Sequence, residues 1–335
     1  MRKLASFAAA ATLAACLQSA SSAPAQQSVT YRVRAEYKLE GRGGAGELWL
    51  DASARRLYVA QEDRVDVLNA DTGRREGTMP AHDAAGILLA AGHGFFANRG
   101  GNSVSFFDPA SLAVIKTVPV GASAPQSLVY DADAARVFVV ASGQVVALDA
   151  GTGEVAGRVA LQGQLRQAAG NGMGSLFVAA QDLDTIHVVD THSLKFLGDV
   201  PAGDGHGPVS LAIDPVGRRL FVACADGSLA VIDTDIGFTF AQLAIGTGDA
   251  GSAFAFNPQG KGGWKGADFV ASAGGKLTLI RMNAFIRYSV GGAVSIPKGI
   301  RAVGYDPRTH WIFLPESAPS PAVLVLAPGS AEVTQ

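Results

Sequence analysis

Apolar and polar positions along this chain repeat a short pattern, in which two apolar runs are separated by a tight turn. Residues 214–233 show it clearly. An acidic residue and Pro-Val-Gly precede the apolar run 220–224, Ala-Asp-Gly follows, and the second run, 229–232, ends at Asp233. Large and β-branched apolar residues favour strands, while Gly, Asp and Pro supply the backbone angles of tight reversals. The pattern therefore predicts a β-hairpin.

Similar hairpins recur through the chain at a nearly constant interval. The turn residue before each hairpin marks seven repeats, at Asp51, Gly92, Asp131, Asn171, Asp214, Asn257 and Asp306. Successive markers lie 41, 39, 40, 43, 43 and 49 residues apart. A period near 40 with several short strands per repeat is typical of WD40-like propellers, in which each blade buries its apolar faces against its neighbours. The sequence predicts an all-β fold, a seven-bladed β-propeller of four-stranded antiparallel blades.

The two ends of the repeat region predict how the ring closes. Residues 30–39 (TYRVRAEYKL) alternate as a half-exposed strand does, and no hairpin precedes them. The last repeat provides only three strands, two within 300–313 and one at 322–326. We predict that 30–39 completes the seventh blade, so that residues 30–330 form one closed propeller without a free sheet edge. The sixth repeat is irregular, with an enlarged turn at 259–266.

The N-terminus has the composition of a targeting segment. Arg2 and Lys3 precede an apolar stretch, 4–15, that is too short for a permanent membrane helix. Two processing routes remain open. Residues 1–25 can be a signal peptide cleaved after Ala25, which gives a soluble periplasmic or secreted protein. Alternatively, 13–16 resembles a bacterial lipobox, so that 1–15 is removed and Cys16 carries a lipid anchor for the outer membrane.

Composition limits the classes of partner. The net charge is −2 and only 17% of residues are charged, so no basic field is available to hold a nucleic-acid backbone. We therefore expect no nucleic-acid partner, contact with membrane only through an anchor at Cys16, and a monomer. Cys16 and Cys224 are the two cysteines, which predicts no structural disulfide. Cys224 lies within a strand and is expected to be a small buried side chain.

The second and fifth repeats carry a recognisable motif. They read FFANRGGNSVSFFDPASLAVIKTVPVG and RRLFVACADGSLAVIDT, and the matching positions are Asn98, Asn102, Val104, Asp108 and 118–121. This pattern resembles the YVTN-type β-propeller repeat, and the resemblance extends from residue 30 onward. It implies an exported bacterial propeller. The family includes surface proteins, periplasmic binding proteins, lactonases and amine-dehydrogenase subunits, so the resemblance leaves function open.

An acidic residue ends the third strand in four repeats, at Asp108, Asp149, Asp190 and Asp233. Each precedes a turn such as Ala-Gly-Thr-Gly. A carboxylate in that position can accept hydrogen bonds from the backbone amides of the turn. We expect these residues to cap turns rather than to bind a metal or act in catalysis.

Candidate binding residues are the polar side chains just before each inner strand. In a propeller these loops, together with those between the second and third strands, converge on one face around the central channel. The candidates are Glu47, His82, Asp83, Gln126, Arg166, His206, Asp249, Lys298 and Arg301. Their mixed charges suit a small polar ligand or a protein partner in the cell envelope. The sequence thus predicts an exported binding or scaffold module without cofactor or metal.

A propeller hydrolase of the lactonase type is the main alternative, and a dehydrogenase-subunit-like propeller is another. A lactonase could use Glu47, Asp83, Asn171 and Asp249 as oxygen ligands of a divalent cation. However, Asn171 is expected on the opposite face from the other three. The six histidines form no HxH or HExxH motif, and His187 and His192 are expected at the surface. We therefore favour binding over catalysis.

Overall fold

The computed structural model describes residues 30–40, 43–256, 266–284, 286–317 and 320–329. The predicted targeting segment, Cys16, Asn257 and residues 259–265 of the irregular sixth repeat lie outside this part of the chain. Across these described ranges, we find no helix with the length and apolar character needed to cross a membrane.

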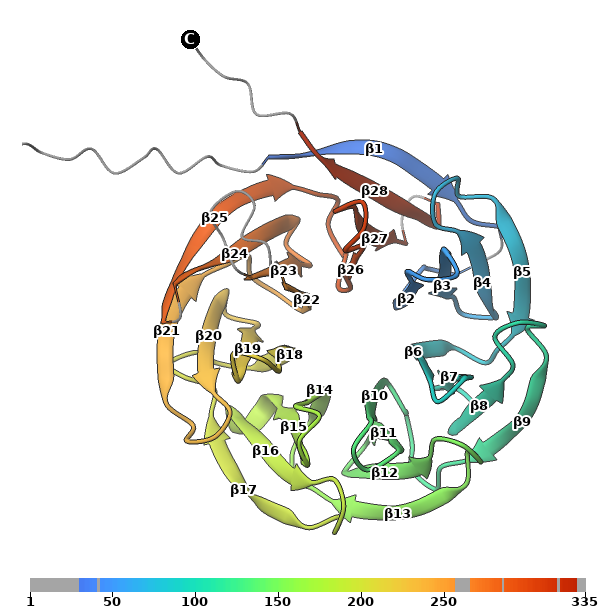
Figure 1. Ribbon diagram of the computed structural model, residues 1–335, viewed down its shortest axis with the longest axis horizontal. Coiled ribbons are helices and arrows are strands. Elements are labelled where there is room, and N and C mark those ends of the chain that lie inside the picture. The colour runs from blue at the N-terminus through green and yellow to red at the C-terminus, as the bar shows by residue number, and fades with distance from the viewer. Residues whose placement is uncertain (1–29, 41–42, 257–265, 285, 318–319, 330–335) are drawn as a thin grey trace, which may run out of the picture.

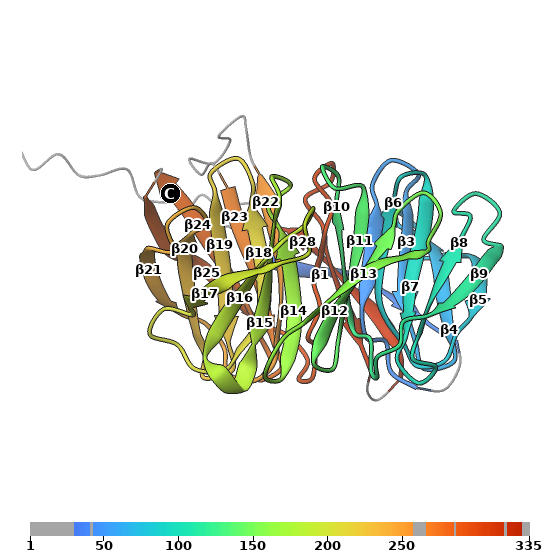
Figure 2. The ribbon, with the colours of Figure 1, turned by 90° about the horizontal axis from the view of Figure 1, so that it is seen from below.

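Seven four-stranded antiparallel sheets stand around a common axis and form a flat ring (Figures 1 and 2). Blade 1 contains β2 (Leu48–Asp51), β3 (Arg56–Ala60), β4 (Arg64–Asn69) and β5 (Arg75–Pro80). Blade 2 contains β6 (Ala84–Ala90), β7 (His93–Asn98), β8 (Ser103–Phe107) and β9 (Val114–Pro119). Blade 3 contains β10 (Ser127–Asp131), β11 (Arg136–Ala141), β12 (Gln144–Asp149) and β13 (Val155–Ala160). Blade 4 contains β14 (Leu165–Gly170), β15 (Ser175–Ala180), the 3-10 turn η1 (Gln181–Leu183), β16 (Thr185–Asp190) and β17 (Phe196–Pro201).

The remaining blades continue the ring. Blade 5 contains β18 (Pro208–Asp214), β19 (Arg219–Cys224), β20 (Ser228–Asp233) and β21 (Thr239–Ala244). Blade 6 contains β22 (Ala250–Phe256), β23 (Gly266–Ser272), β24 (Lys276–Ala284) and β25 (Arg287–Ser295). Blade 7 contains β26 (Gly304–Tyr305), β27 (Ile312–Glu316), β28 (Ala322–Pro328) and, as its outer strand, β1 (Tyr31–Lys38). The predicted seven-bladed propeller closed by the N-terminal strand is confirmed.

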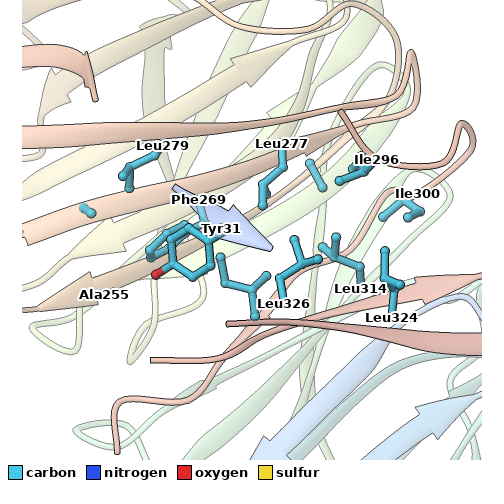
Figure 3. Packing of buried hydrophobic residues seen from close by; sticks show 13 residues of the cluster. Tyr31, Ala255, Phe269, Leu277, Leu279, Ile296, Ile300, Leu314, Leu324 and Leu326 are labelled. Atoms are coloured by element: carbon cyan, nitrogen blue, oxygen red, sulfur yellow. The ribbon is translucent and has the colours of Figure 1, made fainter. Parts of the chain in front are cut away.

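The hydrophobic core lies between the blades. Leu277 and Phe269 of blade 6 pack against Leu314 and Leu326 of blade 7, together with Tyr31 from β1 (Figure 3). The ring of Tyr31 meets that of Phe269 edge to face, with centroids 5.7 Å apart. Burying an aromatic side chain of this size stabilises the fold by about 2 kcal/mol. Because every sheet is apolar on both faces, each blade depends on two neighbours.

The acidic residues at strand ends cap turns, as predicted. The Oδ1 atom of Asp108 accepts hydrogen bonds from the amides of Ala110 and Ser111, at 2.7 and 3.1 Å. Asp149, Asp190 and Asp233 accept equivalent bonds in their own blades. These bonds satisfy backbone donors in the turn and lower the pKa of the Asp108 carboxyl.

A β-bulge in β1 lets one strand seal two interfaces. Tyr31 and Tyr37 are both buried on β1. They lie an even number of residues apart, so a regular strand would point both side chains to the same face of the sheet. The register of β1 against β28 shifts between Val33 and Ala35, which reverses the faces to which later side chains point. Tyr31 therefore packs between blades 6 and 7, while Tyr37 packs between blades 7 and 1 and donates a hydrogen bond to the Ala70 carbonyl.

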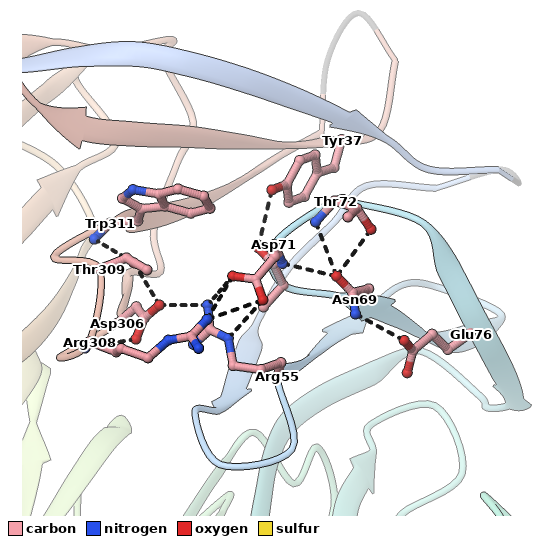
Figure 4. A network of polar contacts seen from close by, with 11 residues as sticks. Tyr37, Arg55, Asn69, Asp71, Thr72, Glu76, Asp306, Arg308, Thr309 and Trp311 are labelled. Atoms are coloured by element: carbon pink, nitrogen blue, oxygen red, sulfur yellow. Dashed lines mark hydrogen bonds and ion pairs between the residues drawn. The ribbon is translucent and has the colours of Figure 1, made fainter.

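A polar latch joins blades 7 and 1 at the end of the channel where the turns between first and second strands lie (Figure 4). The Nη2 atom of Arg55 is 2.7 Å from carboxylate oxygens of both Asp71 and Asp306, and Arg308 also binds Asp71. Burial opposes the charge of Asp306, but hydrogen bonds from Arg55 and Thr309 outweigh it, so the pKa of Asp306 is lowered. The Arg55 guanidinium also lowers the pKa of Asp71.

The expected surface position of His187 is wrong. Its side chain is buried on β16, with Nδ1 2.5 Å from Oδ1 of Asp199 and Nε2 2.9 Å from the Gln162 carbonyl oxygen. Each ring nitrogen therefore faces an oxygen, which makes burial of this polar ring tolerable. Cys224 is buried as predicted. Burial removes solvent from the thiol and raises its pKa to about 12.

We predict that Arg55→Met destabilises the ring by about 3 kcal/mol at pH 7, because it leaves the Asp306 carboxylate buried without its cation. Arg218→Met is the matched control. Arg218 occupies the same turn position in blade 5, also with a positive φ, but among the described residues its ion pair is with the exposed Asp235. Urea denaturation should show a large loss in the free energy of unfolding for Arg55→Met and a near wild-type unfolding midpoint for Arg218→Met.

The same pair of variants has an expected pH dependence. The pKa values of Asp71 and Asp306 are lowered in the folded state, so their contribution is complete above the ordinary carboxyl range of about 4 and is lost as the pH falls below it. The difference in the free energy of unfolding between wild type and Arg55→Met should therefore shrink towards pH 3. An equal difference at pH 7 and pH 3 would contradict the latch.

Candidate functional site

One end of the central channel opens into a polar cavity of about 670 Å³. We call this cavity the mouth. Residues from all seven blades line it, and they come from the first residues of the inner strands, from the loops that enter these strands, and from loops that join the second and third strands. The charged lining residues are Glu47, Glu62, Asp83, Arg99, Arg166, Asp249, Lys298 and Arg301. A cavity that requires every blade exists only in the closed ring.

The structure places seven of the nine candidate residues around the mouth. These are Glu47, Asp83, Gln126, Arg166, Asp249, Lys298 and Arg301. His82 lies outside, in a shallow hollow on the rim that it shares with Glu62 and Asp83. His206 also lies outside, and its Nδ1 atom is 2.9 Å from Oδ2 of Asp184, which raises the pKa of the imidazole. Ligand binding by these residues stays a prediction.

The polar residues of the mouth that the sequence reasoning missed include Gln61, Glu62 and Arg99. Gln61 and Glu62 follow β3, and Arg99 follows β7. All three lie on loops between second and third strands, which propeller geometry directs to this face. Their position between second and third strands could have identified them, but the predicted candidates came only from the loops before inner strands.

Two sets of ion pairs organise the mouth. Arg99 binds Asp83 through two parallel hydrogen bonds of 2.7 and 2.8 Å, an arrangement that lowers the pKa of the Asp83 carboxyl. Asp249 lies between two cations: Oδ1 is 3.1 Å from Arg166 and Oδ2 is 3.5 Å from Arg301. The second set joins blades 4, 6 and 7 across the channel.

Close packing of the inner strands positions these side chains. Gly251 on β22 lies against the backbone of Arg301, where a Cβ atom would overlap the carbonyl oxygen. Gly86 similarly approaches the backbone of blade 3 and donates a hydrogen bond to the Gln126 carbonyl at 3.1 Å. Glycine is needed at both positions because neighbouring backbones touch there. The close approach brings Arg301 of blade 7 next to Asp249 of blade 6.

Glu47 is a partly buried acidic residue of the mouth. Loss of solvation raises the pKa of its carboxyl from 4.5 to about 7, although the nearby Arg99 cation acts in the opposite direction. The side chain makes no ion pair with any residue in the described ranges. Glu47 is thus a carboxyl group whose charge depends on pH near neutrality.

The residues proposed for a lactonase do not come together. Asn171 lies at the far end of the channel, where its Oδ1 atom accepts hydrogen bonds from the amides of Met173 and Ser175. It therefore caps a turn, while Glu47, Asp83 and Asp249 line the mouth. Within the part of the chain that the structure describes, no group of three His, Cys, Asp or Glu side chains is close enough to hold a metal ion.

The chain matches no family model and no curated protein. Solved structures that are similar include a structure of U3-55K, with a TM-score of 0.74, 10% sequence identity and coverage of 89% of this chain and 98% of that one. The crystal structure of the RRP9 WD40 repeats gives the same TM-score and identity and covers 89% and 97%. At this identity the likeness establishes the seven-bladed propeller fold alone. The resemblance to the YVTN repeat rests on the motif residues.

We predict that Glu47→Gln changes the pH dependence of stability. Between pH 4.5 and 7 the folded wild type holds a proton on Glu47 that the unfolded chain has released. This contribution to stability is therefore complete below pH 4.5 and is lost as the pH rises through about 7. Urea denaturation should show the variant gaining stability relative to wild type from pH 5 to pH 8. Parallel pH profiles for the two proteins would refute this assignment.

Proposed function

We propose that this protein is a non-enzymatic binding module that receives a polar segment of a protein partner, or a small polar ligand, in its mouth. The observation that carries the proposal is the lining itself: eight charged side chains from five of the seven blades converge on one cavity. Sites that bury small molecules are mostly apolar with few polar groups. The mouth differs from such sites in its eight charged side chains, and it suits a solvated protein loop.

The propeller architecture supports the same function. Seven-bladed propellers of the WD40 type commonly serve as scaffolds for protein partners, and the similar structures share this architecture. The fold supplies a rigid ring on which loops can vary without disturbing the core, since the loops lie outside the packed sheets. We further propose that the protein acts outside the cytoplasm, soluble or anchored through Cys16, on the basis of the targeting composition of residues 1–16.

A double substitution tests the binding proposal. We expect Arg166→Ala combined with Lys298→Ala to reduce capture of the partner from an extract of the source cells at least about tenfold, because two cations leave the mouth. The control is Lys195→Ala with Arg287→Ala, which removes the same charge from exposed positions that do not line the mouth. Both doubles should retain the wild-type unfolding midpoint. Equal capture by the two doubles would refute binding at the mouth.

The enzymatic alternative has its own measurement. Simple lactones are offered to the wild-type protein with added Ca²⁺ or Mn²⁺, and we expect no turnover above that of the buffer. Metal-dependent hydrolysis that disappears in Glu47→Ala would instead establish the mouth as an active site. The partner-capture result does not depend on this outcome.

A further inference from the structure

The charges of the mouth are separated by blade. On the acidic side, blade 1 contributes Glu47 and Glu62 without a cation of its own. On the basic side, blades 4, 6 and 7 contribute Arg166, Lys298 and Arg301 around the single carboxylate of Asp249. The Asp83 and Arg99 pair of blade 2 is neutral. With all groups ionised, one side carries two negative charges and the other an excess of two positive charges.

On the acidic side, several polar groups have no ion-pair or hydrogen-bond partner among the described residues. Neither Glu47 nor Glu62 forms an ion pair with a residue that the structure describes. Beside them, Gln61 is 1% exposed and donates from Nε2 to the buried carboxylate of Asp66 at 2.6 Å. Its Oε1 atom has no hydrogen-bond partner in the described ranges. A buried oxygen without a hydrogen-bond donor is unfavourable, so this side is built to accept a donor.

The basic side has unused positive charge. Asp249 already receives Arg166 and Arg301, and the Arg301 side chain remains 64% exposed. Lys298 is exposed and forms no ion pair with the described part of the chain. Among the described lining residues, Asp249 is the one carboxylate that forms ion pairs with these cations. This side therefore accepts an acidic group.

We propose that the mouth binds a single segment of a protein partner that carries a basic and an acidic side chain close together. This inference rests on the proposed function and adds the chemistry of the partner. The basic side chain faces Glu47, Glu62 and Gln61, and the acidic one faces Lys298 and Arg301. A partner of uniform charge would meet repulsion on one side, which gives selectivity as well as attraction.

Three synthetic pentapeptides, acetylated and amidated so that their ends are neutral, test the inference. The mixed peptide is Gly-Lys-Gly-Glu-Gly, and the two peptides of uniform charge carry Glu or Lys at both positions. We expect the full chain to bind the mixed peptide at least about fivefold more tightly than either of the others, as measured by isothermal titration calorimetry. Lack of this preference, or no binding of the mixed peptide at millimolar concentration, would overturn the inference.

Charge variants of the two sides provide the matched controls. Lys298→Glu with Arg301→Glu should shift the preference to the peptide with two lysines, and Glu47→Gln with Glu62→Gln should shift it to the peptide with two glutamates. If peptide preference is unchanged in both doubles while Arg166→Ala with Lys298→Ala still loses the partner, the charge-pair inference fails and the proposed function stands. If capture of the partner is unaffected, the proposed function itself fails.

Discussion

The requirement that every sheet be covered on both faces determines this structure. Four short strands cannot bury two apolar faces alone, so each blade is stable only between two neighbours, and the last blade must meet the first. β1 makes that meeting possible. Its bulge places Tyr31 and Tyr37 on opposite faces of blade 7, and the Arg55 latch adds a polar contact across the same seam.

The candidate site depends directly on ring closure. Lys298 and Arg301 enter blade 7, whereas Glu47 enters blade 1, so the acidic and basic sides of the mouth meet across the seam that β1 seals. Interactions far from the mouth therefore help to set its geometry. Asp249, which links blades 4, 6 and 7, holds basic side chains near a common centre and limits how far they move apart.

The fold could be predicted from the sequence because each repeat is defined by neighbouring residues, namely short apolar runs separated by tight turns. The closing strand predicted at 30–39 is observed as β1, and the turn-capping aspartates were predicted from their positions before Gly-rich and Ser-rich turns. The bulge in β1 was not predictable, since TYRVRAEYKL alternates regularly and the register shift arises only against β28. His187 was misplaced because its burial depends on Asp199 and the Gln162 carbonyl, which the topology brings together.

The sequence predicted which face of the propeller carries the mouth, but not every side chain that lines it. Loop order alone identified Glu47, Arg166 and Lys298, yet it could not show that His206 turns towards Asp184 and stays on the rim. Side-chain direction within a loop depends on nearby charges in the adjacent blade, which sequence spacing does not reveal.

The pairing of β1 with β28 also fixes where the polypeptide enters and leaves the ring. Ser317, just before β28, lines the mouth, and β28 runs from there to the opposite face, where the Gly329 amide donates a hydrogen bond to the Thr30 carbonyl at 2.7 Å. Both connections to the ring thus lie on the face away from the mouth. The strand that closes the ring therefore also sets its chain entry and exit at the end of the ring opposite the mouth.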